Sequence, residues 1–455
     1  MPGQDNPPSA LAALPASVDR CTGADRAYFL RWACIWLMIA LGVRTASAVA
    51  LGSALVRAEK AGIASDGTKM YSPMAKNLAA GNGFCVTPGS PSTSHVPGYP
   101  LMVAGVQRIV SSHRAAITIV QVISGTLVVG LTFILTFAFA GPVAAHLAAL
   151  GATFLPDMVL YSMLNLSDMP FLVFVLLGTL VMLKLLHTPT IGWAVLAGVV
   201  IGLGTLVRES MVAFALAWGL MVLAGFFAKG RKVAALQRIA LAGGMVIATA
   251  IMMTPWWVRN YTTFGEFIPL TTKGALNVYA ATRIRPYYMT DARNEGIPLD
   301  PEIAKREAAV YERLAESTSM KEADRILFRA AAENWKLDPI AQIKHLGNKL
   351  LWLWEANIAP RHAARIGFAP ALYLVAGAHY VFSVLGVIGL WMMRRNREAI
   401  ALLIVPFIVV NLFHVIVGIG EPRYHLPVFP ILFVSSAVLI ARGITAWRAR
   451  APLAE

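Results

Sequence analysis

Ten uninterrupted apolar runs dominate the sequence, and this pattern restricts the fold more than any other feature. They lie near residues 30–51, 115–139, 143–160, 169–187, 191–207, 210–228, 237–257, 370–393, 399–419 and 426–446. Most have the roughly 17 to 25 residues that an α-helix needs to cross a bilayer. Since 57% of the residues are hydrophobic and only 14% are charged, we predict an all-α polytopic membrane protein with about ten transmembrane helices.

The positive charges predict the orientation of these helices. Lys and Arg gather in short segments before the first run and after the sixth, eighth and tenth runs, at Arg20, Arg26, Arg31, Lys229, Arg231, Lys232, Arg238, Arg394, Arg395, Arg397, Arg442, Arg448 and Arg450. All of them face the cytoplasm only if both termini do. The apolar stretch 97–110 then cannot cross the membrane, and we expect a re-entrant or interfacial helix there. This topology places Arg108 and Arg114 on the outer side of the membrane.

The net charge of +15 fits a protein whose cytoplasmic loops attract anionic lipid. It does not indicate nucleic-acid binding, because no single segment combines concentrated charge with interleaved aromatic residues. Membrane lipids are therefore the expected surroundings of the chain, and nucleic acid is not an expected partner.

This topology divides the chain into four parts. Residues 1–27 form a cytoplasmic leader, and 28–257 form a transmembrane module whose first outer loop spans 52–114. Residues 258–369 form a large helical loop in the periplasm, and 370–455 form the last transmembrane helices with a short cytoplasmic tail. The Ala46-Ser47-Ala48 segment resembles a signal-peptidase site. Because Arg44 interrupts the approach to it and the polar leader is long, we expect the first run to be retained as a span.

Both outer loops contain helix signals. In the first loop, Ser72 and Pro73 are typical of an N-cap and a first-turn proline, so Asp66 is expected on a loop just ahead of an interfacial helix that ends at Gly81.

The long loop repeats this signal at Asp300-Pro301 and at Asp338-Pro339. The helix that follows Asp338 keeps an apolar face, made of Ile340, Ile343, Leu350 and Trp354. We expect the loop to form a small helical cap, mostly on the membrane surface.

A few charged residues lie at the ends of the apolar runs, and the predicted topology puts them all on the outer face: Asp66, Asp168, Arg208, Arg259 and Arg423. Each ionisable group at membrane depth costs about 2.5 to 3.5 kcal/mol, so such a cluster usually marks a functional site. A carboxylate that faces several cations suits the transfer of a sugar from a polyprenyl phosphate carrier. One general base deprotonates the incoming hydroxyl, and the cations hold the phosphate, which leaves without a proton.

Four motifs follow one another along the chain: Asp66 with Tyr71, Ala75, Leu78, Gly81-Asn82-Gly83-Phe84 and Pro97-Gly98-Tyr99-Pro100; Leu166-Ser167-Asp168-Met169-Pro170; Thr254-Pro255-Trp256-Trp257-Val258-Arg259-Asn260-Tyr261 with Phe264-Gly265; and Glu421-Pro422-Arg423-Tyr424-His425-Leu426-Pro427. In this order they resemble the motifs of the GT-C glycosyltransferases, and most closely those of the protein O-mannosyltransferase-like and aminoarabinose transferase-like group (glycosyltransferase family 39-like). The resemblance covers roughly residues 30 to 445, and the order of the motifs is more specific than any one of them.

The resemblance implies a GT-C helical fold, a polyprenyl-phosphate-linked sugar donor and inversion at the sugar carbon. By motif position, Asp66 matches the catalytic base and Asp168 the second acid, which helps to shape the acceptor site. Gly67 follows Asp66 where many relatives have Glu, which leaves the acceptor (glycan, lipid or protein) and any need for a divalent metal open; no metal ligands are predicted. The expected location is the bacterial inner membrane, with the active site facing the periplasm. The residues assigned to the donor phosphate are Arg208, Arg259 and Arg423, and further substrate-site candidates are Tyr71, His95, Asn260 and Tyr424.

Each of these residues also has a structural interpretation. Asp66 could be no more than a residue that caps a loop, and Asp168 no more than a residue that caps a helix. Arg259 and Arg423 could be arginines at the ends of spans that extend to the interface, and Arg208 could pair with Glu209. His95 is more often a satisfied loop histidine than a ligand.

Proteins with two other functions would have a similar apolar composition. One is a flippase or transporter of lipid-linked sugars, and the other is an oligosaccharide polymerase or ligase. A transporter favours broken helices and charges near the middle of the membrane rather than at one face. The acid between the first two spans favours transfer over both.

Overall fold

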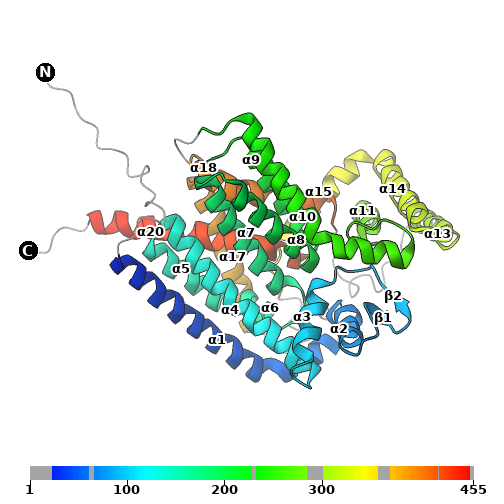
Figure 1. Cartoon of the computed structure of the whole chain (residues 1–455), viewed down its shortest axis with the longest axis horizontal. Coiled ribbons are helices and arrows are strands. Elements are labelled where there is room, and N and C mark those ends of the chain that lie inside the picture. Colours follow the sequence, from blue (N-terminus) through cyan, green and yellow to red (C-terminus); the bar gives the residue numbers. More distant parts are fainter. Residues whose placement is uncertain are drawn as a thin grey trace, which may run out of the picture.

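The chain folds into a bundle of long apolar helices with a small helical cap at one end (Figure 1). This computed structural model describes residues 23–60, 66–227, 232–283, 301–356, 369–418 and 420–450. The elements in order are α1 (Gly23–Lys60), η2 (Gly67–Tyr71), α2 (Ser72–Ala79), β1 (Cys85–Thr87), β2 (Ser90–Pro91), α3 (Gly98–Gln107), α4 (His113–Ala140), α5 (Pro142–Phe154), α6 (Pro156–Tyr161), α7 (Asp168–His187), α8 (Ile191–Val207), α9 (Met211–Leu223), α10 (Ala235–Phe264), α11 (Gly274–Thr282), α13 (Pro301–Ala315), α14 (Met320–Leu337), α15 (Pro339–Leu353), α17 (Ala369–Met392), α18 (Arg397–Ala399), η4 (Ile400–Ile404), α19 (Val405–Ile416), η5 (Pro422–Val428) and α20 (Phe429–Arg450).

All ten predicted apolar runs form helices, but not all of these helices are long enough to cross a membrane alone. Within the described ranges, seven helical segments have the length and composition of a span, and the apolar helices α5, α8 and α9 are shorter, with 13, 17 and 13 residues. At 1.5 Å per residue, 13 residues reach only about 20 Å. The chain is a multi-pass membrane protein, and of the about ten expected transmembrane helices seven segments have the full length of a span while α5, α8 and α9 are shorter.

Prolines explain where two helices differ from the expected runs. The run 143–160 breaks after Phe154, because Pro156 has no N–H to donate and forces Leu155 into an extended conformation with ψ 124°. In α10, by contrast, Pro255 lies inside the helix, which continues beyond the expected end at 257. Proline is tolerated inside membrane helices because neighbouring helices can satisfy the backbone groups that it leaves without a hydrogen bond. Arg259 and Asn260 therefore lie on α10 and not in a loop.

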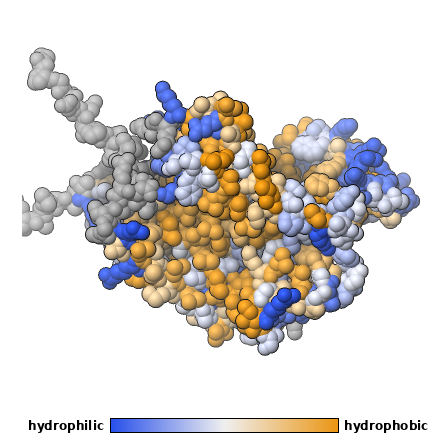
Figure 2. Space-filling view, in the orientation of Figure 1, coloured by the Kyte–Doolittle hydropathy of each residue, from blue (hydrophilic) through white to orange (hydrophobic). Residues whose placement is uncertain are grey.

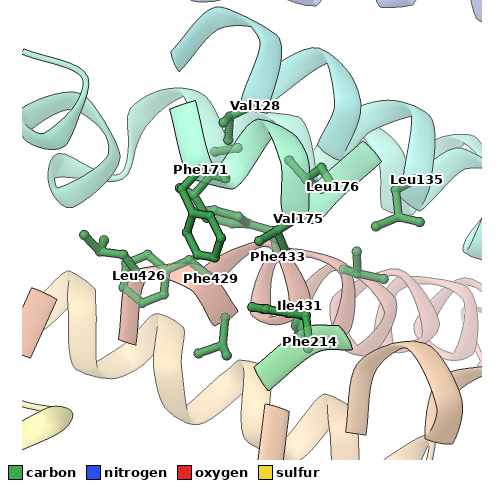
Figure 3. Packing of buried hydrophobic residues seen from close by; sticks show 14 of the residues in the cluster. Val128, Leu135, Phe171, Val175, Leu176, Phe214, Leu426, Phe429, Ile431 and Phe433 are labelled. Carbon is green, nitrogen blue, oxygen red and sulfur yellow. The ribbon is translucent and has the colours of Figure 1, made fainter. Parts of the chain in front are cut away.

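The core of the bundle forms around α7, which packs against α4, α8, α9 and η5. Figure 3 shows Phe171 and Val175 of α7 close to Phe429 and Phe433 of α20. Gly178 lets α9 approach α7, since a Cβ at Gly178 would lie 2.6 Å from the Trp218 ring. This tight packing fixes the amino end of α7, where Asp168 begins the helix.

The outer surface of the bundle is apolar. Figure 2 shows hydrophobic side chains across the middle of this face, with hydrophilic ones gathered toward the two ends and over the cap. Exposed large apolar residues occur along α1, α10 and α17, for example Met38, Val246, Ile251 and Leu374. A surface of this kind is stable only against lipid.

The first loop region contains η2, α2, the antiparallel pair β1–β2 and α3. The helical segment begins at Gly67, six residues earlier than expected, and Ser72 is not its N-cap. The Ser72 hydroxyl instead accepts a hydrogen bond from Asn165 Nδ2 at 2.8 Å, so a tertiary contact replaces the predicted cap. The segment does end at Gly81, which has a φ of 82°.

Helix α3 occupies the stretch that we expected to be re-entrant or interfacial. Its ten residues give about 15 Å of helix, which is too short to cross the bilayer. Its buried side chains Tyr99 and Val103 lie in the main core, and α3 packs against α4 and α8.

The cap consists of α11, α13, α14 and α15 around a small core that includes Tyr279, Val310 and Leu327. Asp338 caps α15 as predicted, because its carboxylate accepts the Ala341 N–H at 2.8 Å. Asp300 lies outside the described residues. The apolar face of α15 points away from the protein, since Ile340, Ile343 and Leu350 are exposed, and the helix buries Gln342, His345 and Lys349 instead.

Candidate functional site

Two segments far apart in the sequence bring Asp66 and Arg423 together. Asp66 directly precedes η2, and Arg423 lies in η5, which connects α19 and α20. Arg423 Nη2 donates to Asp66 Oδ2 at 2.7 Å, and Arg423 Nε donates to Glu421 Oε2 at 2.7 Å. Gly67 is required next to the acid, because a Cβ there would collide with the carbonyl oxygen of Asn165. One guanidinium therefore holds two carboxylates, and the departure from the family pattern at Gly67 has a packing reason.

A second acid–arginine pair joins the ends of α7 and α8. Arg208 follows the last residue of α8, and its Nη1 lies 3.1 Å from Oδ1 of Asp168, which is 1% exposed. Asp168 makes no cap hydrogen bond at the start of α7, and Arg208 pairs with this acid rather than with the adjacent Glu209. These contacts favour the ion pair over the two structural alternatives that the sequence left open, a simple cap and an Arg208–Glu209 pair.

Aromatic rings and hydroxyls connect the two pairs into one cluster. The Tyr71 hydroxyl lies 3.2 Å from Ser167 Oγ, which also accepts from Arg208 Nη1 at 3.2 Å. The Tyr424 ring lies under both guanidiniums, with centroid distances of 5.4 Å to Arg208 and 5.3 Å to Arg423. Both cations thus contact the ring of one tyrosine, and such contacts are favourable.

His95 and Lys273 complete the cluster. The His95 ring packs edge-on against Tyr71 with centroids 5.0 Å apart, and Lys273 Nζ lies 2.9 Å from His95 Nε2. Because an ammonium group can only donate, His95 accepts this bond as a neutral imidazole. Burial, and next the Lys273 charge, lower the pKa of His95 to about 4, which agrees with a neutral ring. Burial also lowers the pKa of Lys273.

The charges of the cluster keep Asp66 ionised. Burial raises the pKa of this carboxyl, but the charge and hydrogen bond of Arg423, with a smaller effect of Lys273, outweigh burial and lower the pKa to about 2. For Glu209, burial prevails over the neighbouring cations and raises the pKa. The site thus contains one firmly ionised loop acid beside a carboxyl that binds protons more readily.

Two predicted site residues lie apart from this cluster. Arg259 on α10 donates to the Ser92 carbonyl at 2.8 Å and to the Phe84 carbonyl at 3.1 Å, and so ties the β1–β2 hairpin to the bundle. Asn260 donates to the Ile268 carbonyl at 3.1 Å. These contacts favour the structural role for both residues, and their substrate roles stay predictions.

Among the described residues, no three His, Cys, Asp or Glu side chains are grouped so that they could hold a metal ion. Asp66 and Asp168 each have an arginine as the counter-ion. The charge of these acids is therefore balanced by protein cations.

Four residues of the cluster were not predicted: Ser167, Lys273, His414 and Glu421. Ser167 and Glu421 lie inside the quoted motifs, so their positions were a usable signal. His414 stacks on the Tyr424 ring at 4.9 Å from within an apolar helix, where a polar residue is uncommon. Lys273 carries no motif in the sequence, and only the fold brings it to His95.

Comparison with known proteins identifies similarity at two levels. Residues 94–258 match the family described as dolichyl-phosphate-mannose-protein mannosyltransferase. This segment contains Asp168 and Arg208, whereas Asp66 and Arg423 lie outside it. The chain matches no curated protein in sequence.

Solved structures share the arrangement of helices. The oligosaccharyltransferase AglB from Archaeoglobus fulgidus, in complex with an inhibitory peptide and a dolichol-phosphate, is 13% identical over 94% of this chain, with a TM-score of 0.51. This chain spans about half of AglB, 52% of its length. ArnT from Cupriavidus metallidurans bound to undecaprenyl phosphate is 15% identical over 91% of this chain and 79% of its own, with a TM-score of 0.42. At such identities the likeness to AglB shows the fold alone, which is the GT-C-like helical fold expected from the motifs.

Proposed function

We propose that the chain is a membrane glycosyltransferase, because residues 94–258 match the family of dolichyl-phosphate-mannose-protein mannosyltransferases. It transfers a sugar, as a hexosyl- or pentosyltransferase, from a polyprenyl-phosphate-linked donor to an acceptor. We place this reaction on the outer, periplasmic face of a bacterial inner membrane. The acceptor is a glycan, a lipid or a protein.

The observation that carries this proposal is the joining of two acid–arginine pairs at one end of the bundle. Asp66 with Arg423, and Asp168 with Arg208, come from four separate segments of the chain. Figure 1 shows α2 and the β1–β2 pair of the first loop region near the cap, at the end of the bundle opposite the carboxyl end of α20. Charged groups at such a depth are costly, and the packing that holds them in one place supports a functional role.

The proposed reaction needs only groups that the cluster contains. Asp66 accepts the proton of the acceptor hydroxyl, whose oxygen forms a bond to the anomeric carbon of the sugar. The bond from this carbon to the phosphate oxygen breaks, and the phosphate leaves with the electron pair. Attack opposite to the leaving group inverts the sugar carbon. Arg423, Arg208 and Lys273 stabilise the charge that develops on the phosphate.

Asp168 and Tyr424 position these groups without taking part in bond formation. Asp168 orients the Arg208 guanidinium from its buried position at the start of α7. Tyr424 keeps both guanidiniums over its ring. Positioned donors that need no rearrangement during the reaction are the most effective stabilisers of developing charge.

A donor with a labelled sugar tests the proposal directly. The purified protein in proteoliposomes is given a radiolabelled polyprenyl-phosphate sugar and an extract of envelope glycans and lipids as acceptors. We expect label to move from the lipid fraction to an acceptor with the wild-type chain and not with Asp66→Asn. A lipid-linked sugar that only changes leaflet, without leaving its carrier, would show a flippase instead. Mass spectrometry of the labelled product then identifies the sugar and the acceptor.

A further inference from the structure

Sugar transfer by the proposed route moves a negative charge within the site. A diester donor carries one negative charge on its phosphate, and the free carrier phosphate carries up to two near neutral pH. Asp66 loses its negative charge when it accepts the proton of the acceptor. The negative charge that Asp66 loses therefore appears on the phosphate. A cation that neutralises first the carboxylate and then the phosphate must lie between them.

Arg423 has the contacts that such a cation needs. Its Nη2 donates to Asp66 and its Nε donates to Glu421, both at 2.7 Å. Its Nη1 donates to no protein acceptor among the described residues, although the side chain is only 19% exposed. The guanidinium thus has one fixed partner, one partner that the reaction neutralises, and one edge with a free donor.

We propose that Arg423 exchanges partners during transfer: it is the counter-ion of Asp66 before the reaction and of the carrier phosphate after it. This inference rests on the proposed function. Before transfer, the ion pair keeps Asp66 ionised and oriented. As the carboxylate takes the proton of the acceptor hydroxyl and the carbon–phosphate oxygen bond breaks, Nη1 and Nη2 become donors to the phosphate oxygens. Arg423 then binds more strongly late in the reaction than at its start, which is the condition for catalysis.

Glu421 is a positioning residue in this exchange. Its hydrogen bond to Nε fixes the plane of the guanidinium, while the Tyr424 ring supports one of its faces. The second pair has no comparable role, because Asp168 is buried and is not the proposed base. Arg208 is therefore expected to keep Asp168 as its partner throughout.

The exchange predicts an unusual effect of removing the base. In the resting protein, Asp66 competes with a phosphate for Arg423, so Asp66→Asn removes the competitor. Undecaprenyl phosphate, which corresponds to the reaction product, should bind to Asp66→Asn about 5- to 30-fold more tightly than to the wild type. This range is the lower part of usual coupling between sites, because the pair is partly exposed. A residue that only contributed to binding would give weaker binding when removed.

A double-mutant cycle with undecaprenyl phosphate in nanodiscs tests the exchange. Affinity is measured for the wild type, Asp66→Asn, Arg423→Gln and the double variant, with Asp66→Ala as a second removal of the carboxylate. The gain in affinity should vanish in the Arg423→Gln background. The matched control is Asp168→Asn, which removes a carboxylate from the other arginine. Its effect on affinity should be largely the same with or without Arg423.

The outcomes separate this inference from the proposed function. Equal affinity in the wild type, Asp66→Asn and Asp66→Ala would overturn the exchange while the proposed function stands. A gain that persists in the Arg423→Gln background would also overturn it, because a partner other than Arg423 would then be responsible. Absence of binding to the wild-type chain would overturn both. Tighter binding in both Asp66 variants, lost with Arg423→Gln, is the result that supports the exchange.

Discussion

Asp66 is held in the ionised form that a general base requires, and this position can be tested without changing the shape of the side chain. Asp66→Asn keeps the size of the residue and can still accept a hydrogen bond from Arg423, but it cannot take a proton. We expect sugar transfer to fall by about 100- to 10,000-fold, with expression and thermal stability close to those of the wild type. Turnover of a labelled donor measures the loss. Near-wild-type turnover would contradict the role of Asp66 as base.

The pH dependence of transfer follows from the Asp66–Arg423 pair. The pKa of Asp66 is lowered to about 2, so the pair is intact above the ordinary pKa of about 4 and is lost as the pH falls through about 2. Asp66 should therefore not limit activity at mildly acidic pH. In Arg423→Gln, burial is no longer outweighed, and the acid limb of kcat/KM should move up by about 1 to 3 pH units. An acid limb at the same pH in both proteins would show that Arg423 does not control this carboxyl.

The two arginines of the late motifs should respond differently to lysine. Lysine keeps the charge but cannot reproduce the contacts of a guanidinium. Arg423→Lys should weaken donor binding by roughly 1 to 3 kcal/mol, the value of a charged hydrogen bond. Arg259→Lys should leave donor affinity unchanged and loosen the hairpin that its guanidinium holds at Ser92 and Phe84. Donor affinity in nanodiscs is the quantity to compare, and weaker binding in Arg259→Lys would return this arginine to the donor site.

At the scale of elements, Lys349 connects the cap to the segment that carries Arg423. From α15, its ammonium donates to the Ala281 carbonyl at the end of α11 at 3.0 Å and to the Gly418 carbonyl after α19 at 3.4 Å. Lys349 is 1% exposed, and burial lowers its pKa to about 8. Between about pH 8 and the ordinary value of about 10.4, the unfolded chain binds more protons than the folded one, so stability rises with pH there.

The prediction from Lys349 uses this pH window. The melting temperature of the wild type, relative to that of Lys349→Met, should rise from pH 8 to pH 10, because only the wild type has a buried amino group that releases its proton on folding in this range. Thermal unfolding in detergent at both pH values measures the difference. A difference that stays constant or falls would mean that Lys349 titrates normally.

At the scale of the whole molecule, the sequence predicted the helices better than the site. Composition decides where a chain can enter lipid, so the ten apolar runs located the helices directly, and Pro156 explains the break after α5. Pairing depends on the fold instead. Arg208 pairs with Asp168, 40 positions away, and not with the adjacent Glu209, and Lys273 reaches His95 only in the folded chain.

Orientation in the membrane is the remaining property of the whole molecule, and it depends on α3 not crossing. Figure 1 shows the amino end of α1 and the carboxyl end of α20 at one end of the bundle, with the first loop region near the other. Because α1 continues to Lys60, a reporter for the outer loop belongs at Arg57 rather than at the expected loop start near 52. Thr87 and Ser111 are exposed on either side of α3, and Arg395 is exposed in the loop between α17 and α18.

Single cysteines at these four positions, in a chain whose native cysteines are replaced by serine, test the orientation. An impermeant thiol reagent added to intact cells should label Arg57→Cys, Thr87→Cys and Ser111→Cys, because α3 is too short to cross and leaves both of its flanks on the same side. Arg395→Cys should be labelled only after the membrane is opened, because cations gather on the cytoplasmic side. Labelling of Ser111→Cys only after opening would mean that the chain crosses the membrane between Thr87 and Ser111. Every later loop would then change sides, and Asp168 and Arg208 could no longer share a membrane face with Asp66, which their contacts through Tyr71 and Ser167 require.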